Sequence, residues 1–150
     1  MNRQLRILLA DDDESFTLLV KRAVLDQPEV ASQCELHCVR DGTEAVDYVL
    51  GRGRFENREQ YPSPDLVLLD QRMREMDGSE ALLEIRKSKS NRTLPVCIYS
   101  TSSQEKLHEL CYSNGAAFCI AKPLDYEILG KKLRLIVEFA RSVLELPRKN

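Results

Sequence analysis

Polar side chains that could do chemistry come directly after several short apolar runs in this sequence. They are four consecutive acids, a lone aspartate, a hydroxyl and an amine: Asp11 to Glu14, Asp70, Ser100 and Lys122. Ligands of open parallel sheets bind in the crevice at the carboxyl ends of the strands, so we expect these groups to converge on one point. The pattern therefore predicts a single polar site that combines carboxylates, a hydroxyl and a lysine.

The crowded carboxylates predict a site for a divalent cation. Carboxylates about 4 to 6 Å apart repel one another, so they either take up protons or share a cation. A site of hard oxygen ligands that is open to water, with only two or three protein ligands, suits Mg2+. We assign Asp13 and Glu14 instead to the start of the following helix, where the helix dipole stabilises anions.

With a cation in place, Asp70 becomes a nucleophile toward a phosphoryl group. Mg2+ neutralises the phosphoryl oxygens that would otherwise repel an anionic attacking group. We expect Lys122 to pair with the transferred phosphoryl group and the hydroxyl of Ser100 to donate to another of its oxygens. The residues thus predict phosphoryl transfer onto an aspartate.

Other uses of such a sheet are disfavoured. A dinucleotide or a flavin phosphate needs glycines or hydroxyls after the first strand, where Asp11 to Glu14 would repel it. A phosphatase with a strand-end aspartate needs a second acid two residues later to protonate the leaving group, and that position is Arg72.

The elements that must position these residues form five strand–helix pairs, because short apolar runs alternate with amphipathic stretches. The strand candidates are Leu5 to Ala10, Glu35 to Val39, Asp65 to Leu69, Val96 to Tyr99 and Ala117 to Ile120. The helix candidates have apolar residues three and four positions apart: Phe16, Leu19, Val20 and Ala23; Ala45, Val46, Val49 and Leu50; Ala81, Leu82 and Ile85; Leu107, Leu110 and Cys111; and a last stretch from about Asp125 to Leu144. This (βα)5 order predicts an α/β fold in which helices cover both faces of a parallel sheet.

The composition excludes several classes of protein. The 150 residues are 43% hydrophobic and 31% charged, as expected for one globular domain. A net charge of -2 argues against nucleic acid or an acidic membrane as partner, because there is no excess of cations to displace counterions. We expect no membrane span and no signal peptide, and hence a cytoplasmic protein. Five cysteines without a CxxC pair predict reduced core residues rather than a metal site.

One irregular stretch, Gly51 to Pro64, carries two glycines, two prolines and several charges. We predict a solvated surface insertion between the second helix and the third strand. The alternative is a partner-recognition loop, because Phe55 and Tyr61 have no obvious core to join.

Motifs at these positions resemble the receiver domain of two-component response regulators. They are Ile7 to Asp12, Pro64 to Asp70, Met76 to Gly78, Pro95-Val96 leading to Ser100, and Ala121 to Pro123. The resemblance covers about residues 4 to 140, and the spacings from Asp70 to Ser100 and from Ser100 to Lys122 are usual for receivers. It implies a flavodoxin-like, CheY-like doubly wound sheet of five parallel strands in the order 2-1-3-4-5.

The resemblance also implies roles for the acidic residues. Asp70 matches the phosphoacceptor, which is at the same time a metal ligand. Asp11 and Asp12 match the acidic pair at the metal, with Asp12 as the other side-chain ligand, and Arg72 supplies a backbone carbonyl. The implied metal is Mg2+.

Ser100 and Lys122 match the family's switch hydroxyl and phosphoryl-binding lysine, but three neighbouring positions depart from the family pattern. Cys119 stands three residues before the lysine, where receivers often carry a switching Tyr or Phe, which argues against aromatic-gated switching. Arg74 replaces a common proline, so the loop after the phosphoacceptor is less rigid. Arg72 is large and basic where family members often have a smaller residue, and we hypothesise that it alters the lifetime of the phosphoryl group.

No output module follows Lys122, which predicts one stand-alone receiver domain over residues 1–150, with an insertion at about 51–64 and a tail at 145–150. Its partners would be a sensor histidine kinase and a downstream protein effector. The insertion, the last helix and the missing output domain resemble the regulators paired with bacterial phytochromes, whereas other stand-alone receivers, such as chemotaxis-type ones, share the core motif.

The last helix has two apolar stripes. They are Leu129, Leu133, Ile136, Ala140 and Val143, and Ile128, Leu135, Phe139 and Leu146. One stripe is expected to cover the sheet, and the other to form a homodimer or an effector contact, unless the two make a single broad buried face.

We therefore expect a signalling protein rather than an enzyme. It would take a phosphoryl group from a kinase phosphohistidine onto Asp70 and change its affinity for a partner through the face of the fourth helix, fifth strand and fifth helix. Two alternatives stay open. A phosphorylation-independent binding module would bind partners equally with or without beryllofluoride, and a small Mg2+-dependent phosphatase would turn over many equivalents of phosphoester.

Overall fold

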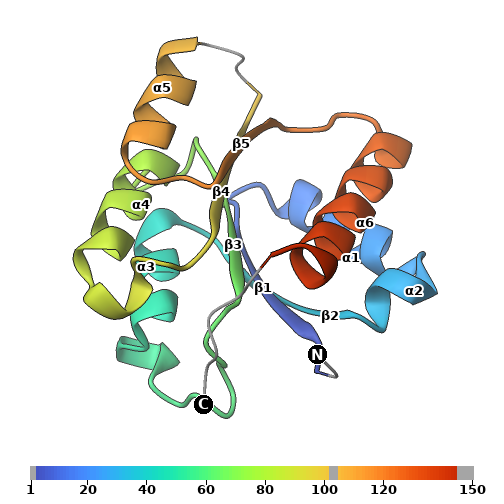
Figure 1. Cartoon of the computed structure of the whole chain (residues 1–150), viewed down its shortest axis with the longest axis horizontal. Helices are drawn as coiled ribbons and strands as arrows, with labels where there is room; N and C mark the ends of the chain where they lie inside the picture. Colours follow the sequence, from blue (N-terminus) through green and yellow to red (C-terminus); the bar gives the residue numbers. More distant parts are fainter. Residues whose placement is uncertain (1–2, 102–104, 145–150) are drawn as a thin grey trace.

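A five-stranded parallel sheet forms the centre of the protein. The computed structural model describes residues 3–101 and 105–144. Its strands are β1 (Leu5–Ala10), β2 (Cys34–Val39), β3 (Leu66–Asp70), β4 (Val96–Ser100) and β5 (Phe118–Ala121). They lie in the order β2-β1-β3-β4-β5, and every neighbouring pair is parallel (Figure 1). The expected fold class and strand order are therefore confirmed.

Helices cover both faces of this sheet. They are α1 (Glu14–Leu25), α2 (Pro28–Ala31), α3 (Gly42–Leu50), α4 (Gly78–Lys87), α5 (Glu105–Ser113) and α6 (Tyr126–Ser142), with short 3-10 turns at Gly53–Phe55 and Lys89–Asn91. Figure 1 shows α3, α4 and α5 on one side of the sheet and α1, α2 and α6 on the other.

The central strands β1, β3 and β4 are mostly apolar because both of their faces are buried, whereas the edge strands β2 and β5 are largely half-buried. In β1, Leu8 and Ala10 pack into the core on the side of α3 and α4, whereas Ile7 and Leu9 pack on the side of α1 and α6. Alternate side chains of a strand point to opposite faces, so each strand contributes to two separate cores. The sheet is thereby packed from both sides.

The loop after β3 is fixed to the strand by the start of α4. Asp77 caps this helix by accepting a hydrogen bond from the backbone N–H of Glu80, whose side chain in turn accepts from the N–H of Asp77. A Cβ atom at Gly78 would lie 2.6 Å from the backbone oxygen of Asp70, too close for any residue but glycine. The end of β3 and the first turn of α4 therefore hold each other in place.

Several element boundaries and faces differ from the sequence-based expectation. Helix α2 is an additional single turn, which no apolar periodicity marks. On α1, Leu19 is 42% exposed and Val24 is buried in its place. On α6, which ends at Ser142, Val143 is 63% exposed and Val137 joins the core. These differences arise because the buried face of a helix is set by the sheet that it contacts, and not by spacing alone.

The insertion is not a wholly solvated loop. Phe55 is only 3% exposed, and its ring lies 5.0 Å from the ring of Tyr48 and 5.1 Å from that of Tyr61. Arg58 donates hydrogen bonds to the backbone oxygens of Tyr48 and Val49 at the end of α3, at 2.7 and 2.8 Å. The expectation that the two aromatic rings lack a core is wrong, because the last turn of α3 provides one.

Two further expectations concern the cysteines and the membrane. All five cysteines are free thiols, of which Cys34, Cys97 and Cys111 are buried and the other two are half-buried. Among the helices described, none combines the length and the apolar composition that crossing a membrane requires.

Candidate functional site

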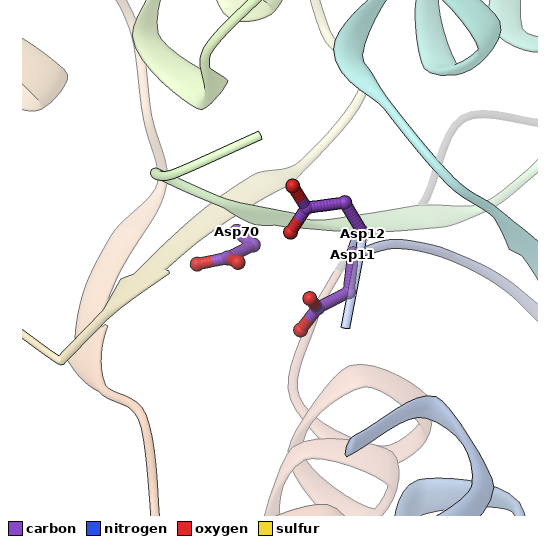
Figure 2. A group of neighbouring side chains, drawn as sticks. All are labelled: Asp11, Asp12 and Asp70. Atoms are coloured by element: carbon purple, nitrogen blue, oxygen red, sulfur yellow. The ribbon is translucent and has the colours of Figure 1, made fainter. Parts of the chain in front are cut away.

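Three carboxylates meet where β1 and β3 end. Asp11 and Asp12 follow β1, and Asp70 is the last residue of β3, which pairs with β1 so that Ala10 lies opposite Leu69. One oxygen from each carboxylate lies within 4.8 Å of one from each of the other two, and Figure 2 shows the side chains gathered at this edge. Asp11 and Asp70 are buried and Asp12 is half-buried.

Lys122 brings a buried ammonium to these carboxylates. Its Nζ atom lies 2.9 Å from Oδ2 of Asp11 and 3.6 Å from Oδ2 of Asp70, and only 9% of the side chain is exposed. The backbone N–H of Lys122 donates to the oxygen of Ser100 at 2.8 Å, which aligns the chain after β5 with the end of β4. Lys122 thus meets Asp11 and Asp70, both far from it in the sequence, at the carboxyl edge of the sheet.

Asp11 has further partners that the sequence did not reveal. The backbone N–H of Asp13 donates to its Oδ1 at 2.8 Å, and the hydroxyl of Tyr99 donates to its Oδ2 at 2.8 Å. Tyr99 was expected only as the end of a strand. The one available signal was a hydroxyl-bearing aromatic placed directly before Ser100 in an otherwise apolar run.

Burial and the neighbouring carboxylate raise the pKa of Asp70 from its ordinary value of 3.8 to about 7. Burial is the largest cause and the neighbouring charge of Asp11 the next, while Lys122 and a hydrogen bond from the backbone N–H of Arg72 oppose the rise. Two carboxylates at this separation do not both ionise readily unless a cation neutralises them. The donor set therefore fits a hard divalent cation, which prefers carboxylate oxygens.

An open cleft of about 610 Å³ lies beside the carboxylates. Ser100, which is buried at the end of β4, lines this cleft together with Asp12 and residues of the loop after β3. It lies at the same carboxyl edge of the sheet as the three acids.

Two arginines stand at the mouth of the cleft. The side chain of Arg72 is exposed, and the Nε atom of Arg74 lies 4.0 Å from Oδ2 of Asp12. Asp13, in contrast, accepts a hydrogen bond from the backbone N–H of Phe16 at 3.2 Å and so caps α1, in the helix-starting role expected for it.

Residues 7–134 match the model of the response regulator receiver domain, so the chain belongs to this family. Receiver domains are signalling proteins of two-component systems, in which the partner is a sensor histidine kinase, and they bind a divalent metal ion. The resemblance noted in the sequence is thereby confirmed.

Individual relatives cover nearly the whole chain. The response regulator Rcp1 of Synechocystis sp. is 30% identical over 148 residues, which span 94% of this chain and 92% of that protein. The crystal structure of the phosphorylated cyanobacterial phytochrome response regulator RcpA is similar with a TM-score of 0.86 at 29% identity, over 97% of this chain and 100% of that one. The crystal structure of the Mn2+-bound form of Rcp1 is similar with a TM-score of 0.82 at 28% identity. The match covers 96% of this chain and 99% of that one.

Proposed function

We propose that this protein accepts a phosphoryl group from the phosphohistidine of a sensor histidine kinase onto Asp70, with Mg2+ as the divalent ion. The observation that carries the proposal is the position of Asp70, buried beside Asp11 and Lys122 at the end of β3. The adjoining cleft supports it by giving a donor access to that edge.

In this proposal the chain's own residues prepare the attack. Asp12 and Asp70 hold the metal with the backbone carbonyl of Arg72, and Asp11 completes the acidic cluster. When bound, Mg2+ neutralises the phosphoryl oxygens and the crowded carboxylates. Asp70 attacks as a carboxylate, so it must first lose the proton that burial favours near neutrality. The charge of Lys122 lowers the pKa of Asp70 and therefore favours this loss.

The transfer exchanges one bond to phosphorus for another. The oxygen of Asp70 forms a bond to phosphorus while the bond between phosphorus and the imidazole nitrogen of the donor breaks. Lys122 lies close enough to Asp70 to pair with the transferred group, and the hydroxyl of Ser100 donates to another of its oxygens. The chain acts as a phosphoacceptor with slow self-catalysed hydrolysis, and not as an enzyme with turnover.

The phosphoryl group would be sensed on the face formed by α5, β5 and α6. The hydroxyl of Tyr112 on α5 accepts a hydrogen bond from the backbone N–H of Cys119 at 3.2 Å, which couples this helix to the edge strand. Leu135 and Phe139 of α6 are 50% and 39% exposed, and Leu146 of the same expected stripe lies outside the described residues. We assign this face to a protein effector or a second copy of the chain. Size exclusion at two concentrations separates these, since a strictly monomeric profile removes the dimer.

The kinase partner that we favour is a bacterial phytochrome. We place the transfer reaction in the cytoplasm. Support comes from the relative RcpA, whose name describes a phytochrome response regulator, and from the nearly complete overlap of the two chains. Transfer from a purified bacteriophytochrome kinase, compared with an unrelated sensor kinase, tests this pairing. Equal transfer rates from both kinases would contradict it.

Labelling by acetyl phosphate tests the phosphoacceptor. With Mg2+, the wild type should take up about one phosphoryl group per chain, and Asp70→Asn none. Asp13→Asn is the matched control, because asparagine also caps a helix and the variant keeps every acid of the cluster. Label that persists in Asp70→Asn at the same stoichiometry would show that another residue accepts the phosphoryl group.

A further inference from the structure

Tyr99 lies inside the sheet directly behind the acidic cluster. It is 3% exposed, and its hydroxyl lies 2.8 Å from Oδ2 of Asp11 and 3.3 Å from the backbone oxygen of Ala10. A buried hydroxyl that donates to a carboxylate fixes the orientation of that carboxylate, as second-layer partners do at metal sites. Tyr99 thus holds one acid of the cluster without facing the cleft.

The ring of Tyr99 also borders the ammonium of Lys122. The Nζ atom lies 4.2 Å from the ring centroid of Phe16 and 5.7 Å from that of Tyr99, and the two centroids are 5.7 Å apart. Aromatic faces attract a cation that has lost its water, and Lys122 is nearly buried. The two rings therefore form an aromatic seat for the ammonium, which also contacts Asp11 and Asp70.

We propose that Tyr99 is a positioning residue of the phosphoryl-transfer site, which orients Asp11 through its hydroxyl and, with Phe16, seats Lys122 through its ring. The inference rests on the proposed function, since it assigns Tyr99 to that same site. Tyr99 lies on β4 inside the sheet, whereas the residue three before the lysine, on the edge strand β5, is Cys119. The effect of Tyr99 on the reaction passes entirely through Asp11 and Lys122.

Loss of the hydroxyl alone tests whether Tyr99 orients Asp11. Tyr99→Phe keeps the ring and removes the donor to Asp11, so Mg2+ titrated calorimetrically into the protein without any phosphoryl donor should bind about tenfold more weakly. Tyr126→Phe is the matched control, because the hydroxyl of Tyr126 also donates to a carboxylate, that of Asp26 at 2.6 Å, on the exposed surface. This control should bind Mg2+ as the wild type does.

A spectroscopic signature tests whether the ring of Tyr99 seats Lys122. When beryllofluoride and Mg2+ draw the ammonium of Lys122 toward Asp70, it leaves the ring of Tyr99, and the near-ultraviolet absorption of a tyrosine should shift. The shift should be absent in Tyr99→Phe and present in Tyr126→Phe. A merely structural tyrosine would change thermal stability in the variant but leave Mg2+ affinity unaltered.

The outcomes separate this inference from the proposed function. If Tyr99→Phe folds, as judged by cooperative unfolding, and binds Mg2+ as tightly as the wild type, the positioning role is overturned. A difference spectrum that is unchanged in Tyr99→Phe overturns the seating of Lys122. If the wild type takes no label on Asp70, the proposed function fails instead, whereas the calorimetric comparison still decides whether Tyr99 orients Asp11.

Discussion

Two buried aspartates lie at the two ends of the strand β3, and they differ in the charges that surround them. Asp65, just before the strand, is 2% exposed; Arg3 contacts its two carboxylate oxygens at 2.7 Å each, and the backbone N–H of Arg6 donates to it at 2.8 Å. Asp70, at the other end, is 6% exposed, but it faces the like charge of Asp11 and its cationic partner stands 3.6 Å away.

The comparison separates structural from functional use of the same side chain. A bidentate arginine and a backbone donor give Asp65 the partners that an ionised, buried carboxylate needs. Asp70 lacks that degree of compensation, and burial and the charge of Asp11 raise its pKa. An added cation or phosphoryl group can relieve the deficit at Asp70, whereas Asp65 would gain nothing from either.

The largest effect is expected at the structural end. Asp65→Asn removes the charge opposite Arg3 and one of the two paired hydrogen bonds, so the free energy of unfolding should fall by about 3 kcal/mol. Urea unfolding at neutral pH measures it. A loss below about 0.5 kcal/mol would show that Asp65 is no better compensated than Asp70, and would remove the contrast.

Asp70→Asn should have the opposite sign. The folded-state pKa of about 7 lies above the ordinary 3.8, so the folded protein binds this proton more tightly, and the free energy of unfolding falls as pH rises through this window. The full shift corresponds to about 4 kcal/mol, and screening by solvent at the open cleft reduces it by about half. The variant avoids that cost, and should be about 2 kcal/mol more stable than the wild type near pH 8 and about equal to it near pH 4. Equal stabilities near pH 8 would mean that Asp70 ionises without strain.

The sequence anticipated the functional end of β3 better than its surroundings. Buried parallel strands are continuous apolar runs, and ligands collect after their carboxyl ends, so Asp70 and Lys122 could be placed from local pattern alone. The partner of Asp65 could not, because Arg3 lies 62 residues away and nothing in the strand pattern points to it. Polar contacts between distant segments carry no periodicity.

The same limit explains what was missed elsewhere. Phe55 sits in an irregular segment, and its burial follows from the position of Tyr48 on α3, which the segment itself does not encode. Tyr99 fits the apolar run of its strand, and only the three-dimensional approach of β1 gives its hydroxyl a partner in Asp11. Local propensity predicts elements, while these contacts depend on how the elements pack.

Mg2+ should stabilise the protein only through the functional end. At about ten times its dissociation constant, a ligand that binds the folded state alone raises the free energy of unfolding by about 1.4 kcal/mol. We expect this increase in the wild type and in Asp65→Asn, and its loss in Asp12→Asn, which removes one of the acids of the cluster. Thermal unfolding with and without Mg2+ measures it. Stabilisation of Asp12→Asn to the same extent would place the cation elsewhere.

The smallest effect concerns the arginines near the two aspartates. Arg3 is held on Asp65 by two hydrogen bonds, whereas the side chain of Arg72 is exposed at the cleft beside Asp70. An exposed guanidinium at this position can pair with the phosphoryl group and keep water from it, so Arg72→Asn should lose label about threefold faster. The decay of acid-precipitable label after removal of acetyl phosphate gives the rate.

Arg74→Asn is the matched control for this prediction. Arg74 lies near Asp12, so its loss should change the rate less. An autodephosphorylation rate that is the same in Arg72→Asn and the wild type would reject the role, and would leave the difference between the two arginines a matter of packing alone.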